Sequence, residues 1–158
     1  MTPRTGVPLT EILLLTVWMG AAVLFVAVVA PSAFLVLPSR TLAGALVGRV
    51  LPVIFYAGVV IGAAIVVLDI LGRTGTWTRT AAGAVSALAC AVAQLVVGTR
   101  IDRLRAAIGG PLEALAPDDP RRVAFGRLHA FSVGWLGIAM LAAIVALALA
   151  VRALHARP

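Results

Sequence analysis

The amino-acid sequence predicts an all-α polytopic membrane protein: a bundle of four transmembrane helices with an interfacial amphipathic helix between the third and the fourth. The chain is 62% hydrophobic with a mean hydropathy of +1.10, which is too apolar for an ordinary soluble domain of 158 residues. Its charged residues, 12% of the total, cluster between long apolar runs. These runs approach the length of about 20 residues that an α-helix needs to cross the hydrocarbon core of a bilayer.

Four runs are long enough to span a membrane, and with their connections we expect them to form a single transmembrane domain over residues 1–158. The predicted spans cover residues 9–30, 50–68, 80–98 and 128–151. A signal peptide is the competing interpretation of the first run. That run is longer than a usual signal core, and Pro31 would directly follow the cleavage point, so we expect a retained helix.

The second and fourth helices are expected to extend beyond their spans. The second should begin near Thr41, and Pro52 in its first turns should bend it or free a carbonyl group. In the third connection, apolar residues recur at helical spacing between arginines over residues 101–108, which is typical of an amphipathic helix at headgroup level. The segment 109–111 (Gly-Gly-Pro) should end it. Asp119-Pro120 then supplies an N-cap and a first helical residue for the last helix.

The arginines predict an orientation. All 13 basic residues are Arg; the first and third connections hold eight of them, and the termini and second connection hold five. The positive-inside rule therefore places those two connections in the cytoplasm and the termini outside the inner (cell) membrane. A net charge of +7 does not indicate nucleic-acid binding here, because the arginines flank spans instead of forming one continuous face. The expected partners are membrane lipids and either a larger membrane protein complex or further copies of the chain.

Small and polar residues should mediate helix packing, because lipid offers helices no hydrophobic reason to associate. The second helix carries two pairs of glycines four residues apart. Other glycines lie on the first and fourth helices. The full set is Gly20, Gly44, Gly48, Gly58, Gly62, Gly126, Gly134 and Gly137. We interpret them as packing grooves, with a self-dimerisation motif as the alternative.

One polar stripe follows the third helix, where Ser86, Cys90 and Gln94 recur every four residues. Facing lipid, the Gln94 amide would have no hydrogen-bond partners, so the stripe should face the bundle. Hydrogen bonding between helices is one interpretation, and the lining of a solute path is the other.

A polar cap is predicted where the first and third connections meet the membrane. A side chain that changes charge near neutral pH, at a boundary between water and lipid, is either a working group or a fixed anchor; here it is a histidine with arginines around it. The candidate cap residues are Arg49, Tyr56, Arg100, Asp102, Arg127, His129 and Ser132. They could bind a lipid headgroup, a small anion or a partner protein. Alternatively, the histidine could simply fix the depth of its helix.

Metal, haem and catalytic sites are not expected. The single cysteine, Cys90, excludes an intrachain disulfide and any multi-cysteine metal motif. His129 and His155 would lie roughly 39 Å apart on one helix at 1.5 Å per residue, so they cannot share a metal ion or a haem within one copy. No acid lies at helical spacing from His129, and no nucleophile motif surrounds Ser132. We therefore expect no cofactor and no enzymatic activity.

Three segments together carry a family resemblance. They are residues 18–20 (Trp-Met-Gly) leading to 30–34 (Ala-Pro-Ser-Ala-Phe), residues 44–56 with their Arg-Val-Leu-Pro, and residues 125–132. With them, the chain resembles the bacterial four-span proteins of unknown function that are akin to eukaryotic transmembrane protein 205. The spacing of Phe125, His129 and Ser132 is the most specific part, together with the basic residue three before the proline of residues 44–56. The resemblance implies a four-helix membrane protein and supplies no settled reaction.

Two departures from the family pattern bear on function. Ala130 stands where the family commonly has Gly, and Leu136 where it commonly has Asn. The missing Asn argues against a polar pathway past His129. We expect a non-enzymatic accessory or solute- and lipid-binding component. The alternatives are a haem-binding redox subunit that uses His129 across a dimer, and a small-solute transporter that uses the polar stripe.

Overall fold

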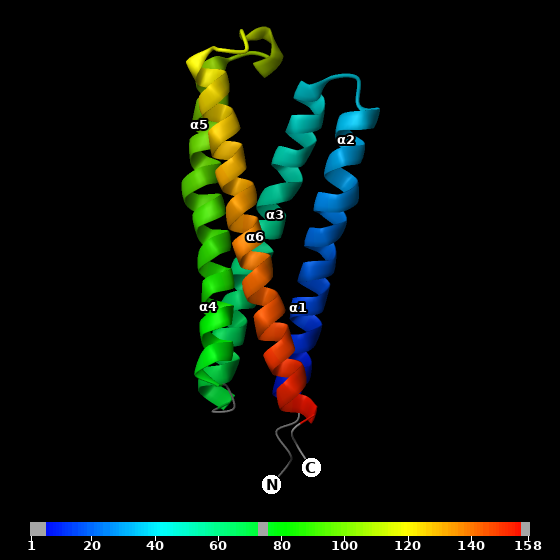
Figure 1. Cartoon of the computed structure of the whole chain (residues 1–158), viewed down its shortest axis with the longest axis vertical. Helices are drawn as coiled ribbons and strands as arrows, with labels where there is room; N and C mark the ends of the chain where they lie inside the picture. The colour runs from blue at the N-terminus through cyan, green and yellow to red at the C-terminus, as the bar shows by residue number, and fades with distance from the viewer. Residues whose placement is uncertain (1–5, 73–75, 156–158) are drawn as a thin grey trace.

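A computed structural model describes residues 6–72 and 76–155 as four helical rods joined by short connections (Figure 1). The rods that could span a membrane are Leu9–Val36, Arg40–Leu71, Trp77–Ile108 and Pro120–His155. No strand occurs among the described residues. These rods contain the four predicted spans and confirm the all-α polytopic fold. The first rod begins and the fourth ends at the same end of the bundle, as an even number of spans requires.

The first rod runs further than its predicted span. It consists of α1 (Gly6–Leu24), a π-helical segment η1 (Phe25–Val29) and α2 (Ala30–Val36). Pro31 does not end it: the proline directly follows the π-helical segment, and the chain stays helical on both sides of it. The apolar run therefore continues as helix beyond residue 30.

The second rod is a single helix, α3 (Arg40–Gly72), which begins one residue before the predicted Thr41. The Ser39 hydroxyl accepts the Leu42 N–H at 3.2 Å and so satisfies one of the free donors of the first turn. Pro52 lies inside the helix and cannot donate to the carbonyl of Gly48.

The third rod contains the predicted amphipathic helix as its last part. It consists of α4 (Trp77–Ala91), a π-helical segment η2 (Val92–Gly98) and α5 (Thr99–Ile108), and α5 continues the direction of α4 (Figure 1). The amphipathic segment is helical, but it extends the third span instead of lying apart from it. Nothing breaks the helix at residue 99, where the Thr99 hydroxyl donates back to the Leu95 carbonyl at 2.9 Å.

The last connection and the fourth rod confirm the predicted boundaries. Gly109, at φ 66°, ends α5 in the left-handed conformation that glycine adopts without strain. A 3₁₀ turn, η3 (Leu112–Ala114), follows. The fourth rod, α6 (Pro120–His155), begins at the predicted proline, and the Asp119 carboxylate accepts the Arg121 N–H at 2.8 Å.

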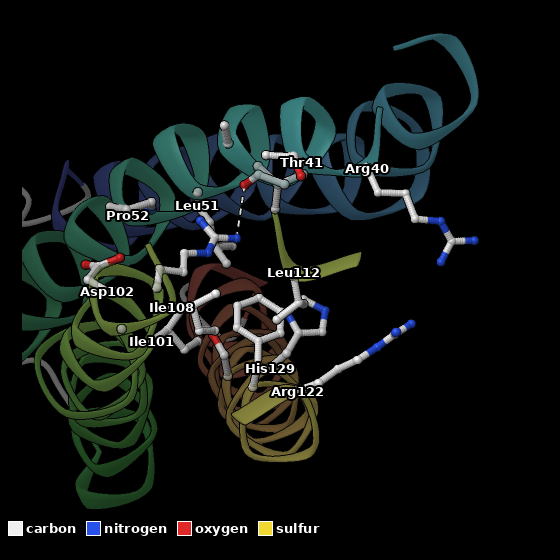
Figure 2. A pocket seen from close by; sticks show the side chains of 18 of the residues that line it. Arg40, Thr41, Leu51, Pro52, Ile101, Asp102, Ile108, Leu112, Arg122 and His129 are labelled. Carbon is white, nitrogen blue, oxygen red and sulfur yellow. Dashed lines mark hydrogen bonds between the residues drawn. The ribbon is translucent and has the colours of Figure 1, made fainter. Parts of the chain in front are cut away.

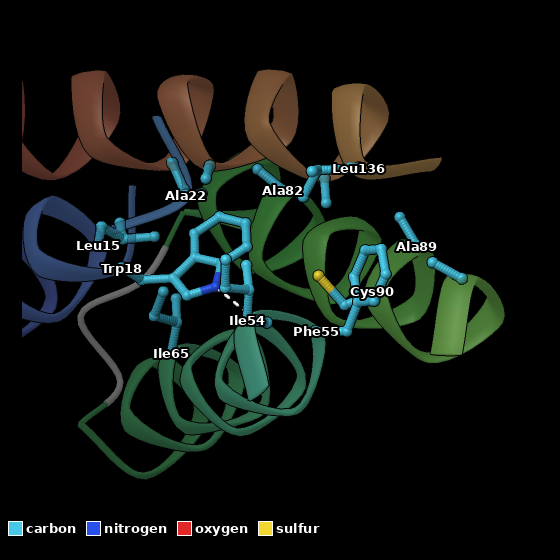
Figure 3. Close-up of a cluster of buried hydrophobic side chains, with 14 of the residues drawn as sticks. Leu15, Trp18, Ala22, Ile54, Phe55, Ile65, Ala82, Ala89, Cys90 and Leu136 are labelled. Atoms are coloured by element: carbon cyan, nitrogen blue, oxygen red, sulfur yellow. Dashed lines mark hydrogen bonds between the residues drawn. The ribbon is translucent and has the colours of Figure 1, made fainter. Parts of the chain in front are cut away.

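The core lies where α1, α3, α4 and α6 meet (Figure 3). Gly58 lets α3 approach both α1 and α4, since a Cβ there would lie 2.5 Å from Cys90 Sγ and 2.8 Å from Trp18 Cζ2. The Trp18 indole N–H donates to the Ile54 carbonyl at 2.9 Å, which satisfies its one polar atom inside the core. One turn further along α3, a Cβ on Gly62 would lie 2.7 Å from the Gly83 carbonyl oxygen of α4.

Glycine is not the small residue that packs the fourth helix. A Cβ on Gly20, Gly126, Gly134 or Gly137 would meet nothing within 4 Å, so the prediction that these glycines form packing grooves is wrong. The close approach of α6 instead uses alanines spaced three and four residues apart. They are Ala139, Ala143, Ala146 and Ala150, all at most 1% exposed. Alanine brings two helices nearly as close as glycine does and keeps the higher helix propensity.

We expect Gly62→Ala to destabilise the protein and Gly134→Ala to leave it as stable as the wild type or slightly more so. The first change forces a methyl group against the backbone of α4, and such overpacking costs about 1–3 kcal/mol. The second adds a methyl group in open space. Thermal unfolding of both variants in one detergent measures the difference. Equal melting temperatures would contradict the close packing of α3 on α4.

Candidate functional site

A cavity of about 460 Å³ lies at the end of the bundle that carries the first and third connections. It is bounded by the first half of α3, by α5 and by the first turns of α6, where the second rod diverges from the third and fourth (Figures 1 and 2). The charged residues that line it are Arg40, Asp102, Arg105, Glu113 and Arg122.

Arg105 is the cation held inside this cavity. Its Nη2 donates to the Gly44 carbonyl at 3.3 Å. A Cβ on Gly48 would lie 2.8 Å from Arg105 Nη1, so the guanidinium group occupies the space that the missing side chain leaves. The Gly44/Gly48 pair was predicted to be a groove for a neighbouring helix. Instead it receives an arginine side chain.

Two aromatic rings continue the wall behind this guanidinium group. The Arg105 guanidinium carbon lies 5.2 Å from the centre of the Phe125 ring, at cation–π distance. The Phe125 and His129 rings are stacked, with centres 6.4 Å apart and planes 2° apart. These two residues are one helical turn apart on α6, which explains why their rings share one face of that helix.

Two more arginines stand at the mouth of the cavity. Arg40 and Arg122 extend to the same side, away from the helices that carry them (Figure 2). The Arg122 Nη1 donates to the Leu115 carbonyl at 2.8 Å and so ties the third connection to α6. Arg40 begins α3 and Arg122 lies in the first turn of α6, so both side chains lie at the same end of the bundle.

Glu113 ties the third connection to α3. Its Oε1 accepts the Thr41 N–H at 3.2 Å, one of the free donors at the start of that helix. Its own backbone N–H, and then the Thr41 group, hold the pKa of this carboxyl below its usual value. Glu113 is therefore an anion that closes one side of the cavity.

Below the arginines, the walls of the cavity are mostly apolar. They include Leu51, Pro52 and Phe55 of α3 and Ile101 of α5. The polar groups at this depth are Gln94, Ser132 and the carboxylate of Asp102, which lies beside Pro52 (Figure 2). The arginines therefore lie towards the mouth of the cavity, and its deeper part is mostly apolar with one carboxylate.

The structure brings together only some of the predicted cap residues. Asp102, His129 and Ser132 line the cavity. The other four are exposed and do not line it: Arg49, Tyr56, Arg100 and Arg127. They lie on the outer faces of their helices because the helical period turns them away from the cavity. Asp102 forms no ion pair within the described residues.

Sequence reasoning did not assign Arg105, Arg122 or Glu113 to the site. The available indication was the glycine pair on the second helix, which can receive a long side chain as well as a helix. Of the polar stripe, Gln94 lines the cavity, Ser86 donates to the Ala139 carbonyl at 3.1 Å, and Cys90 is fully buried in the core. Ser86 therefore makes the hydrogen bond between helices that one interpretation predicted.

A second polar cluster, also missed, lies at the opposite end of the bundle. Arg79 of α4 pairs with Asp69 of α3 and lies 3.4 Å from a carboxylate oxygen of Glu11 on α1. All three residues are at most 3% exposed. The sequence did offer one sign of this cluster: the first, second and third spans each have one charged residue, Glu11, Asp69 and Arg79, near this end of the bundle.

We expect the tether between Glu113 and Thr41 to weaken in acid. Because its folded-state pKa is lowered, the carboxylate stabilises this contact at pH values above its ordinary pKa of 4.5, and the contribution is lost as the pH falls through the lowered value. Hydrogen–deuterium exchange of the Thr41 amide should show protection that Glu113→Ala removes at neutral pH, whereas Asp118→Ala leaves it unchanged. Equal protection in wild type and Glu113→Ala would contradict the tether.

Comparison with known proteins identifies the family of this chain but no relative of known function. A search of curated proteins and a search of solved structures found no match. A family model described as a domain of unknown function (DUF4149) matches residues 13–109, which include most of the first rod and all of the second and third rods. The chain is therefore a multi-pass membrane protein that belongs to the DUF4149 family.

Proposed function

We propose that the chain is a non-enzymatic phospholipid-binding membrane protein, which holds the phosphate of a lipid headgroup in the Arg105 cavity. The observation that carries this proposal is the position of the Arg105 guanidinium group, inside a cavity of about 460 Å³. The lipid's acyl chains would lie against the apolar walls below.

The chemistry of Arg105 suits a phosphate. A guanidinium group has five N–H donors in a rigid plane, and phosphate oxygens accept two of them at once. Among the described residues, the hydrogen bond to Gly44 is the only one that this side chain donates. Phe125 and Gly48 hold the group in place before a ligand arrives, which reduces the entropy that binding must overcome.

The depth profile of the cavity suits an amphiphile better than a free anion. Arg105 lies in the last turn of α5, and Arg40 and Arg122 lie in the first turns of α3 and α6, so the positive charges gather at one end of the bundle. Three arginines against two carboxylates leave an excess of one positive charge before His129 is counted. This balance favours a group with a single negative charge, and the apolar walls below favour hydrocarbon.

The remaining parts of this proposal are the orientation, which the positions of the arginines support, and the role and assembly of the chain. By the positive-inside rule, the cavity faces the cytoplasm and the termini lie outside the inner membrane. The chain acts as an accessory component, either as a homo-oligomer or within a larger membrane complex. It is related to eukaryotic transmembrane protein 205. Haem binding by His129 across a dimer and solute transport along the polar stripe stay predictions.

We expect Arg105→Gln to weaken phospholipid binding about tenfold or more, since a hydrogen bond to a charged group contributes about 1.5–3 kcal/mol. Arg103→Gln is the matched control, because Arg103 lies on the same helix, is exposed and does not line the cavity. Native mass spectrometry of protein released from mild detergent, titrated with a phospholipid, measures the bound fraction for each variant.

Two further ligands separate the possible sources of the phosphate. A diacylglycerol with the same acyl chains lacks the phosphate and should bind weakly to wild type and variants alike. Inorganic phosphate should compete only at far higher concentration than the lipid. If inorganic phosphate binds as well as the lipid, the ligand is a free anion. Equal loss in Arg103→Gln and Arg105→Gln would show that only surface charge attracts the lipid.

We also expect Gly48→Ala to weaken lipid binding without loss of stability. The new methyl group would lie 2.8 Å from Arg105 Nη1, the far end of a flexible side chain, so the guanidinium group moves and the helices do not. The same titration measures binding, and thermal unfolding measures stability. Unchanged lipid binding would show that Arg105 does not act from this position.

A further inference from the structure

The cluster of Glu11, Asp69 and Arg79 has a charge imbalance in a place that water does not reach. The three residues are 0%, 3% and 1% exposed and come from α1, α3 and α4. Two carboxyl groups thus meet one guanidinium group. Charges buried this completely among apolar helices must be paired or neutralised.

Asp69 accepts two of the five N–H donors of Arg79. Arg79 Nε donates to Asp69 Oδ2 at 3.2 Å, and Arg79 Nη2 donates to Asp69 Oδ1. The Thr80 hydroxyl adds a third donor, 3.0 Å from Asp69 Oδ2. Two parallel bonds from a guanidinium group and one from a hydroxyl are the surroundings of an ionised carboxylate.

Glu11 has none of these donors. Its nearest cationic atom is Arg79 Nε, 3.4 Å from Glu11 Oε2, and that N–H already points to Asp69. Among residues 6–72 and 76–155, neither carboxyl oxygen of Glu11 has a hydrogen-bond partner. An ionised carboxylate in that position would lose its hydration and gain almost nothing in return.

The other elements around this end do not correct the imbalance in the described part of the chain. Glu11 is the only charged residue of α1, and Arg79 the only one of α4. On α6, Arg152 and His155 are exposed, and the His155 ring bonds to the Val151 carbonyl of its own helix. Arg4, Arg73 and Arg157 lie outside the described residues.

We propose that Glu11 carries a proton, which makes this cluster a proton-binding site inside the membrane. The proton comes from hydronium in the surrounding water: one O–H bond breaks there, leaving water, and one forms on a Glu11 oxygen. The Glu11 and Asp69 carboxyl groups both face Arg79, so the Asp69 carboxylate is the acceptor for the new O–H. The cluster then holds one negative and one positive charge. Loss of the proton would place two carboxylates face to face and weaken the contact of α1 with α3 and α4.

The test is infrared spectroscopy of the full chain in lipid nanodiscs at neutral pH. We expect the carbonyl stretching band of a protonated carboxyl group in the wild type, shifted when water is replaced by heavy water. Glu11→Gln should remove the band. Glu113→Gln, which changes a carboxyl group at the other end of the bundle, should keep it. Absence of the band in the wild type, or its survival in Glu11→Gln, would overturn the proposal.

Two further variants test the cause. In Asp69→Asn, Arg79 is released to pair with Glu11, which should then ionise. The infrared band should therefore be lost although Glu11 remains, and a retained band would contradict the charge argument.

Glu11→Gln mimics the protonated side chain and should keep the wild-type melting temperature, whereas Arg79→Gln should lower it. A drop in Glu11→Gln as large as in Arg79→Gln would mean that Glu11 is ionised and paired with Arg79. These outcomes do not depend on lipid binding.

Discussion

The close approach of α3 to α4 is the contact on which the rest of the structure depends. In lipid, helices associate through tight packing and polar contacts, and Gly62 gives α3 such a contact against the Gly83 carbonyl. Half a helix away, Gly44 and Gly48 repeat the same spacing, but the space above them is filled by the Arg105 guanidinium group. One helix thus uses the same residue pattern to close the bundle at one end and to hold a cation in a cavity at the other (Figure 1).

Arginine has opposite roles at the two ends. Arg79 is buried and bonded to Asp69, so its charge is neutralised by a contact that joins α3 to α4. Arg105 has one hydrogen bond to a carbonyl and an aromatic ring beneath it, so its charge is left for a ligand. The first arrangement stabilises a helix contact, and the second favours binding at the membrane boundary. The end of the bundle that contains Arg79 thus holds helices together, with a proton on Glu11 balancing its charges. The end that contains Arg105 binds the ligand.

Features set by a few neighbouring residues could be predicted from the sequence. The four spans follow from apolar length, and the ends at Gly109 and Asp119 follow from backbone conformation and capping. The continuous third rod was missed because amphipathic periodicity identifies a helix but does not fix its direction. The cavity was missed in part because helical spacing alone does not say which face of α3 or α5 looks inward. The cluster of residues 11, 69 and 79 requires three helices to be placed against one another, which no local pattern specifies.

The central claim is that Arg105 binds lipid phosphate from inside the bundle. Solid-state NMR of the protein in phospholipid bilayers tests it most directly, by measuring the dipolar coupling between lipid phosphorus and the guanidinium nitrogens of individual arginines. We expect a coupling at Arg105 that indicates direct contact and that is stronger than at Arg49 and Arg103, which are exposed and do not line the cavity. A coupling at Arg105 no stronger than at those two residues would contradict it.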